Sequence, residues 1–168
     1  MNVILVRHAM PAVRPEVPPE EWVSSDEGRA AARRLATLLP ADAVLVASDE
    51  PKAAQTLPTA VRDARFREVR RQEAFSDDFA VARRSYVEGA PPAEWEPYES
   101  VVARFDSGVS DYTVDGRPLA IATHGMAMTV WLTARISLAD PGSFWAALRF
   151  PDAIEVDLSA RTWRRLAP

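Results

Sequence analysis

The sequence predicts an α/β protein, a three-layer sandwich with a mostly parallel central sheet and helices on both faces. Two apolar runs, Val3–Val6 and Pro118–Thr123, are the first indication. Runs without polar alternation are typical of strands buried on both faces, as in the middle of a parallel sheet. Strand, helix and strand patterns also follow one another up to Ala47, which predicts a right-handed parallel crossover.

The first helix is expected over Asp26–Leu39. Ser24 stands three residues before Glu27, which is the spacing of a capping box. Apolar residues then recur at helical spacing, and Pro40 ends the pattern. A second buried strand is expected over residues 42–47 because its centre is continuously apolar.

The middle of the chain combines short elements with breaks. Ser48 closes the second strand and is expected to cap a further helix with Pro51 near its start. Residues 65–71 form a short strand candidate. The segment 76–97 is broken by Gly and Pro, and we expect a short helix over 78–87 followed by a loop, together forming a flap over the site.

The C-terminal third shows the same periodicities. Helices are expected over 99–112 and 126–136, a short irregular or helical piece over 141–150, and a terminal hairpin of strands 154–158 and 162–166. No internal repeat or linker divides the chain, so residues 1–168 are predicted to form one domain.

Composition excludes several classes of protein. The 168 residues carry a net charge of −4, so no global basic field exists to hold nucleic acid or an anionic membrane. The absence of cysteine excludes disulfides and thiolate-bound metal. The N-terminal apolar run is too short for a signal peptide and is broken at Arg7-His8. These features predict a cytoplasmic protein and leave its oligomeric state open.

The chain has two histidines, and each directly follows a buried-strand pattern. His8 comes after Arg7 at the end of the first strand, and His124 precedes Gly125 at the end of the later one. In open α/β sheets, ligands bind beyond the carboxyl ends of the strands. One such histidine is most simply a satisfied core residue, but two at equivalent places indicate a shared ligand site.

Two further side chains are candidates on position alone. Lys52 lies in the first turns of a predicted helix near the strand ends, where free backbone N–H groups suit phosphate; the simpler interpretation is an exposed helix lysine. Glu73 follows the strand candidate at 65–71, as the histidines follow theirs. The arginines between 62 and 71 indicate a solvated edge rather than a nucleic-acid patch, because acidic residues flank them and no aromatic stacking pattern accompanies them.

Five segments in order resemble the motifs of the histidine phosphatase (phosphoglycerate-mutase-like) superfamily. Arg7-His8-Ala9 is similar to the family's Arg-His-Gly motif, and residues 48–56 are similar to its Ser-x-x-x-Arg-Ala-x-Gln-Thr segment. Glu73 stands where the family carries its acid. Tyr98-Glu99-Ser100 with Arg104 resembles the family's Gly-Glu-Ser…Arg segment, and residues 122–125 resemble its second histidine motif. The resemblance implies a phosphoglycerate-mutase-like fold and phosphoryl-transfer chemistry.

The residue types suit that chemistry. A phosphoryl group in transfer spreads negative charge over three oxygens, and positively charged donors stabilise it. Arg7 offers a planar fork, Lys52 a point charge, and His124 a further donor. Either histidine could attack phosphorus; the resemblance implies His8, which would form a phosphohistidine. Glu73 is the nearest candidate acid. No metal or other cofactor is predicted, because these side chains supply the positive charge.

Two departures from the family pattern bear on activity. Ala9 replaces a glycine, which would cost about 1 kcal/mol if the position needed a positive φ. Lys52 replaces an arginine and cannot form a bidentate fork. Three hypotheses therefore stand: a phosphatase acting on a small phosphorylated metabolite or phosphoprotein, a phosphomutase, or a catalytically weak protein that binds a phosphorylated ligand or inorganic phosphate. The short 76–97 segment disfavours the mutase.

Overall fold

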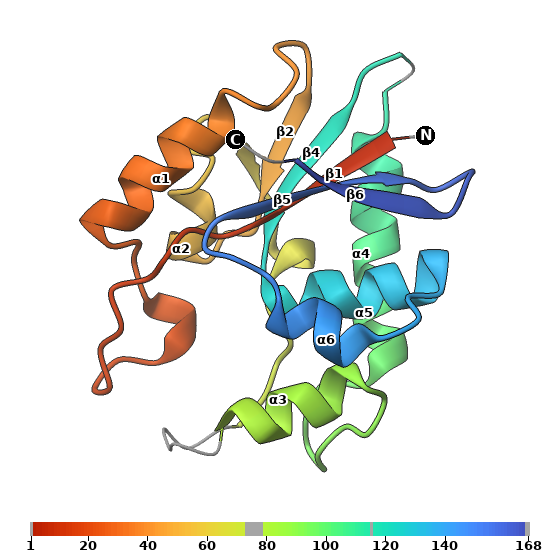
Figure 1. The fold of residues 1–168 in the computed structure, drawn as a ribbon. Coiled ribbons are helices and arrows are strands. Elements are labelled where there is room, and N and C mark those ends of the chain that lie inside the picture. Colours follow the sequence, from red (N-terminus) through yellow and green to blue (C-terminus); the bar gives the residue numbers. More distant parts are fainter. Residues whose placement is uncertain (1, 73–78, 115, 167–168) are drawn as a thin grey trace.

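A computed structural model describes residues 2–72, 79–114 and 116–166, and its centre is a mixed β-sheet (Figure 1). The strands are β1 (Asn2–Arg7), β2 (Val44–Ala47), β3 (Val61–Arg62), β4 (Leu119–Thr123), β5 (Asp152–Asp157) and β6 (Thr162–Leu166). They are ordered β3-β2-β4-β1-β5-β6. The pairs β3–β2, β2–β4 and β4–β1 are parallel, while β5 and β6 run antiparallel at one edge. The predicted mostly parallel sheet is confirmed.

Helices cover both faces of this sheet. They are α1 (Asp26–Ala36), α2 (Pro51–Ala54), α3 (Phe79–Val87), α4 (Tyr98–Tyr112), α5 (Gly125–Ile136) and α6 (Pro141–Ala146), with short 3-10 turns at Pro19–Glu21 and Ala64–Phe66. Helix α1 lies on one side of the sheet, and α4 and α5 lie on the other (Figure 1). The three layers expected from the sequence are therefore present.

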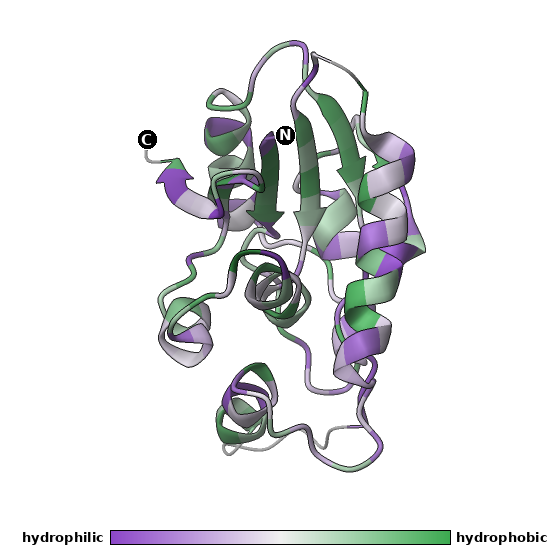
Figure 2. Cartoon of the chain, turned by 90° about the vertical axis from the view of Figure 1, so that its right-hand side faces the viewer, coloured by the Kyte–Doolittle hydropathy of each residue, from purple (hydrophilic) through white to green (hydrophobic). Residues whose placement is uncertain are grey.

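The central strands are buried on both faces because their side chains alternate between two apolar clusters. Ile4 and Val6 of β1 pack in one cluster with Leu35 of α1. Val3 and Leu5 point the other way, into the larger cluster that contains the apolar residues of α4 and α5. Figure 2 shows the central strands largely in the green of hydrophobic residues. This two-sided burial explains why the sequence shows uninterrupted apolar runs here.

The register between β1 and β4 determines where the site forms. The two strands pair in parallel with Arg7 opposite Thr123. The next residue of each strand is a histidine, and the His8 backbone N–H donates to the Thr123 carbonyl at 2.9 Å. The two imidazoles therefore leave the sheet side by side at the carboxyl ends of adjacent central strands, as the sequence predicts.

Local structure differs from the prediction at the start of α1. The N-cap is Ser25, whose side chain accepts from the Gly28 N–H, and not Ser24. Ser24 is occupied elsewhere: it forms an isolated β-bridge with Pro11, and its hydroxyl donates to the Lys52 carbonyl. Tertiary contacts thus shift the capping position by one residue.

The prediction of a strand over residues 65–71 is also wrong. The edge strand is β3, only Val61–Arg62, and the chain then makes the 3-10 turn at Ala64–Phe66. The Phe66 ring is fully buried, so the apolar signal at this place comes from core packing and not from a strand. In the part of the chain that the structure describes, no helix has the length and hydropathy to cross a membrane.

Candidate active site

His8 lies at the end of β1 with only 7 % of its surface exposed. Its Nδ1 is 2.8 Å from the carbonyl oxygen of Ala9. A carbonyl only accepts, so Nδ1 carries the proton and Nε2 is left with a free lone pair. The ring centroid is 5.1 Å from that of His124 and 5.3 Å from that of Phe150. His8 thus presents an unprotonated nitrogen next to the second histidine.

His124 is the N-cap of α5 and is completely buried. Its Nε2 is 2.9 Å from the Ser48 hydroxyl oxygen and 3.6 Å from Oε1 of Glu50. Its Nδ1 is buried and has no hydrogen-bond partner among the described residues. A buried polar atom without a partner is costly and rare in folded proteins, so this nitrogen is a candidate for contact with a ligand.

Arg7 shows the same feature. Its Nη1 donates to the Leu148 carbonyl at 2.7 Å, and its guanidinium carbon lies 3.5 Å from the centroid of the Phe150 ring. Its Nε, like Nδ1 of His124, is buried without a partner among the residues described. Gly125 packs against it, since a Cβ there would lie 3.3 Å from Arg7 Nε and 3.1 Å from Trp145 Nε1. Two unpartnered nitrogens therefore lie on adjacent strand ends.

Lys52 is not the exposed helix lysine of the simpler interpretation. It is 5 % exposed, and its Nζ donates to Oε2 of Glu50 at 2.7 Å and to the Pro19 carbonyl at 2.5 Å. Glu50, the N-cap of α2, is 6 % exposed and has no place in the sequence-based site. The sequence feature that could have indicated Glu50 is its position two residues before the candidate cation Lys52. A buried ion pair thus stands where the resemblance implies a single cation.

Sequence comparisons find no relative: no family model and no curated protein matches the chain. Solved structures do match. A mycobacterial glucosyl-3-phosphoglycerate phosphatase in complex with VO3 has a TM-score of 0.70 and 19 % identity, covering 98 % of this chain and 96 % of that chain. TTHB049 from Thermus thermophilus has a TM-score of 0.73 and 21 % identity over 100 % of both chains. The chain has the fold of the histidine phosphatase superfamily.

Glu68 is a partly buried carboxylate that the sequence analysis missed. On this histidine phosphatase fold it sits at the N-terminus of α5, where it accepts from the N–H groups of Ala127 at 2.8 Å and Met126 at 3.2 Å. Burial acts to raise the pKa of Glu68, but His124, Arg71 and a backbone N–H outweigh it and lower that pKa. Glu68 is therefore ionised at neutral pH. Spacing from an apolar run could not reveal it, because no strand precedes it.

Glu73, the acid expected from the sequence, lies outside the described residues. The helix expected over 78–87 is present as α3 (Phe79–Val87). Tyr86 at its end is buried, and its hydroxyl donates to the Glu96 carbonyl at 2.8 Å. The role of the 76–97 segment as a flap stays a prediction.

Burial lowers the pKa of both histidines well below 6.5. For His8, the neighbouring His124 and Lys52 lower the pKa further. For His124, Lys52 also lowers the pKa, while Glu68 opposes this. Both imidazoles are thus neutral in the ligand-free protein at neutral pH, which is the form that a nitrogen nucleophile requires.

Ala9 does not strain the backbone. The described non-glycine residues with positive φ are Glu94, Ser137 and Arg161. The Ala9 side chain is fully buried, and its N–H donates to Thr56 Oγ1 at 2.8 Å. The expected cost of replacing glycine at this position therefore does not arise.

Arg104, in the segment that resembles the family's Gly-Glu-Ser…Arg motif, acts on the backbone. Its Nε donates to Oε1 of Glu96 at 2.8 Å, and its Nη1 donates to the carbonyls of Arg65 and Arg67 at 2.6 and 2.8 Å. The guanidinium thereby orders the irregular chain that leads to Glu68. Its place is beside the site and not in it.

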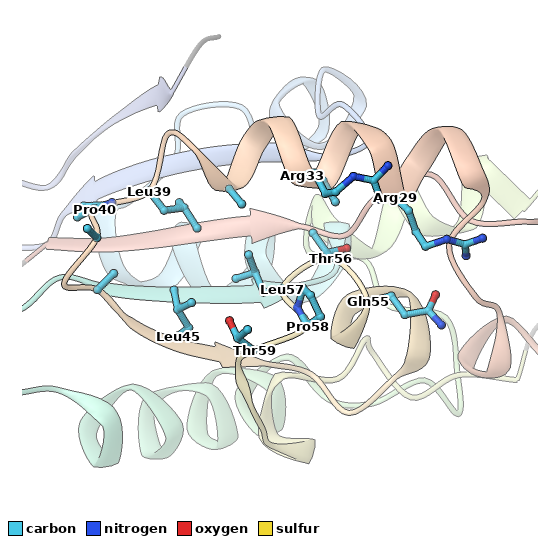
Figure 3. Close-up of a pocket in the computed structure, with 14 residues that line it drawn as sticks. Arg29, Arg33, Leu39, Pro40, Leu45, Gln55, Thr56, Leu57, Pro58 and Thr59 are labelled. Carbon is cyan, nitrogen blue, oxygen red and sulfur yellow. The ribbon is translucent and has the colours of Figure 1, made fainter.

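A separate hollow of about 790 Å³ lies between α1 and the chain around β2 (Figure 3). Its walls are largely apolar, with Arg29 and Arg33 of α1 among the lining residues. Neither histidine lines it. Thr56 belongs to this hollow and also accepts from Ala9, so the two regions are joined through one hydroxyl.

Proposed function

We propose that the chain is a phosphoric monoester hydrolase that acts through a phosphohistidine on a small phosphorylated metabolite or phosphoprotein. One observation carries the proposal: His8, which keeps a free lone pair, has its ring 5.1 Å from that of His124, and among the described residues His124 Nδ1 and Arg7 Nε are both buried without a hydrogen-bond partner. A tetrahedral anion offers several acceptor oxygens and would satisfy both nitrogens. It would also place a phosphorus atom next to the His8 imidazole.

The reaction proceeds in two displacements. Nε2 of His8 forms a bond to phosphorus as the P–O bond to the leaving group breaks, and the electron pair leaves with that oxygen. Arg7 and His124 hold the equatorial oxygens while negative charge develops on them. Water then attacks the phosphohistidine, the P–N bond breaks, and neutral His8 is regenerated with release of inorganic phosphate. The Ala9 carbonyl keeps the His8 tautomer correct throughout.

The leaving oxygen needs a proton, and the water must lose one. Glu73 is the sequence-based candidate for both steps. Glu68 is the stronger candidate among the described residues, because its partly buried carboxylate interacts electrostatically with both His124 and Arg7. The arrival of a phosphate dianion raises the pKa of a neighbouring carboxyl, which makes proton uptake and return by Glu68 feasible at neutral pH.

The matching structures support an anion site of this kind. The mycobacterial glucosyl-3-phosphoglycerate phosphatase is known in complex with VO3 and, at a TM-score of 0.67 and 20 % identity over 99 % of this chain and 95 % of that chain, with inorganic phosphate. At this identity the likeness supports phosphatase chemistry for our chain and carries no inference about its substrate.

The weak binder remains the second candidate because a specific observation favours it. The Lys52–Glu50 ion pair puts a carboxylate among the cations and reduces the positive charge available to phosphate. A phosphomutase is the third candidate, since the same two histidines could return the phosphoryl group to the product.

Turnover of p-nitrophenyl phosphate between about pH 5 and about pH 8 separates these functions. We expect steady release of p-nitrophenol, with an acid-labile phosphoryl group trapped on the protein. Failure of turnover while inorganic phosphate still binds would establish the binder instead. Stimulation by a bisphosphorylated primer would identify a mutase.

The two candidate acids are distinguished by their amide variants. Glu68→Gln is expected to lower kcat for p-nitrophenyl phosphate by about 10²-fold, because the amide cannot exchange a proton, whereas Glu73→Gln is expected to lower it less than about threefold. The amide of Glu68→Gln keeps one acceptor for the α5 N–H groups, so the variant should fold. The opposite ranking of the two variants would return the role to Glu73.

A further inference from the structure

Glu50 is a buried carboxylate inside a site proposed to bind an anion. Its Oε2 is 2.7 Å from Lys52 Nζ. Its Oε1 accepts from the Glu68 N–H at 2.8 Å and lies 3.6 Å from His124 Nε2. A buried carboxylate is costly unless its charge is compensated, and an arriving anion would repel it. Glu50 therefore needs an explanation beyond that of a helix cap.

The two nitrogens of His124 have different surroundings. Nε2 faces the Ser48 hydroxyl and the Glu50 carboxylate, whereas Nδ1 is the buried nitrogen left without a described partner. A neutral imidazole carries one proton and can donate from one side only. An imidazolium donates from both, with Nδ1–H directed to the anion and Nε2–H to Ser48 or Glu50. The geometry on the Nε2 side is suited to the charged form.

Charge balance leads to the same conclusion. In the ligand-free site both histidines are neutral, and the charges of Arg7 and Lys52 are matched by those of Glu50 and Glu68. Arg71 adds one further positive charge. Several charged or titratable groups surround His124. They are Arg7 at the end of β1, His8 directly after it, Glu50 and Lys52 at α2, Glu68 and Arg71 in the chain before α3, and Arg104 on α4, which is paired with Glu96. A dianion entering this site adds two negative charges, and protonation of His124 offsets one.

We propose that Glu50 is the counter-ion of a protonated His124 in the anion-bound protein, so that binding of a tetrahedral dianion takes up one proton. The inference rests on the proposed function, since it uses the same anion site. In the free protein, burial and Lys52 lower the pKa of His124, and the proton is absent at neutral pH. In the bound protein, the anion on Nδ1 and Glu50 on Nε2 both favour the charged ring.

Sulfate is a suitable probe because it is a tetrahedral dianion that does not itself titrate near neutral pH. Binding of sulfate with uptake of one proton weakens as pH rises, by about tenfold in Kd per pH unit between the free and bound values of the histidine pKa. Calorimetry from about pH 6 to about pH 8 measures this slope. We expect close to one proton taken up per sulfate bound by the natural protein.

Glu50→Gln tests the role of the carboxylate. The amide leaves Lys52 uncompensated and no longer stabilises an imidazolium, so sulfate should bind more tightly at about pH 8 and its Kd should change less than about twofold per pH unit. Asp42→Asn is the matched control: it removes one exposed carboxylate in the turn before β2, at the opposite end of the strand from Glu50, and should retain the natural slope.

An independent measurement needs no variant. The chain has two histidines, so two ¹³Cε1 signals report on both rings, and one of them should show a higher pKa when sulfate is saturating. A natural protein that binds sulfate without proton uptake, a Glu50→Gln protein that keeps the slope, or ring signals that do not shift with sulfate would each overturn the role of Glu50 and leave the proposed phosphatase standing. Absence of any sulfate, phosphate or vanadate binding would overturn the anion site itself.

Discussion

Replacing His8 with alanine is expected to lower kcat for p-nitrophenyl phosphate by about four orders of magnitude, with no acid-labile phosphoryl group left on the protein. The reason is that Nε2 of His8 keeps a free lone pair beside the His124 ring, while its Nδ1 is committed to the Ala9 carbonyl. Initial rates at saturating substrate, together with ³¹P spectra of base-quenched protein, measure both effects.

The matched comparison is His124→Ala. Its imidazole binds the anion but does not attack it in the proposed mechanism, so kcat should fall by about 10²-fold and the phosphohistidine should still form. Spacing in the sequence left open which histidine attacks, and this pair of variants decides it. Retention of the phosphoryl adduct in the His8 variant, with its loss in the His124 variant, would reverse the assignment. Unchanged thermal midpoints serve as the folding control.

Replacing Phe66 with alanine is expected to lower the free energy of unfolding by about 3–5 kcal/mol. The ring is fully buried and meets Phe105 edge-on, with the ring centroids 4.9 Å apart. Helix α4 approaches it so closely that a Cβ at Gly108 would lie 2.5 Å from the Phe66 Cζ. The cavity left by alanine is hard to fill, because Phe66 is faced by the backbone of α4 at Gly108 and by the stiff ring of Phe105.

Urea unfolding of the Phe66 variants measures the change. Phe66→Leu is the conservative control and should cost less than about 1.5 kcal/mol, since most of the apolar volume is kept. The alanine variant should also lose activity before it unfolds, because residues 66–68 connect this core contact to Glu68. A loss of stability under about 1 kcal/mol would show that the ring is not a principal contact between α4 and the sheet.

The sequence alone determined the central part of the fold and of the site. The runs at Val3–Val6 and Leu119–Thr123 are buried on both faces, and uninterrupted runs of this length are typical of strands in the middle of a covered sheet. Each run ends at a histidine, and parallel strands present their carboxyl ends at one edge. The sequence therefore predicted that His8 and His124 lie at the same edge of the sheet, while the strand order decided that β1 and β4 are neighbours.

Tertiary structure decided the elements whose signals are short or whose partners are distant in sequence. The apolar residues at 65–71 serve core packing and not a strand, because Phe66 inserts under α4 and the edge strand is completed by two residues at Val61–Arg62. Ser25 caps α1 because Ser24 is held by Pro11 and Lys52. In each case a long-range contact outweighs a local preference of comparable size.

The charges of the site were the least predictable feature. A periodic pattern reports burial, and a buried charge is normally an exception to that pattern. Glu50 is buried because Lys52 compensates its charge two residues away. Glu68 is partly buried because the first N–H groups of α5, some 58 residues later in the chain, stabilise its charge. The sequence thus placed the two imidazoles, while the folded chain alone decided which carboxylates surround them, since only three-dimensional proximity can offset the cost of removing a charge from water.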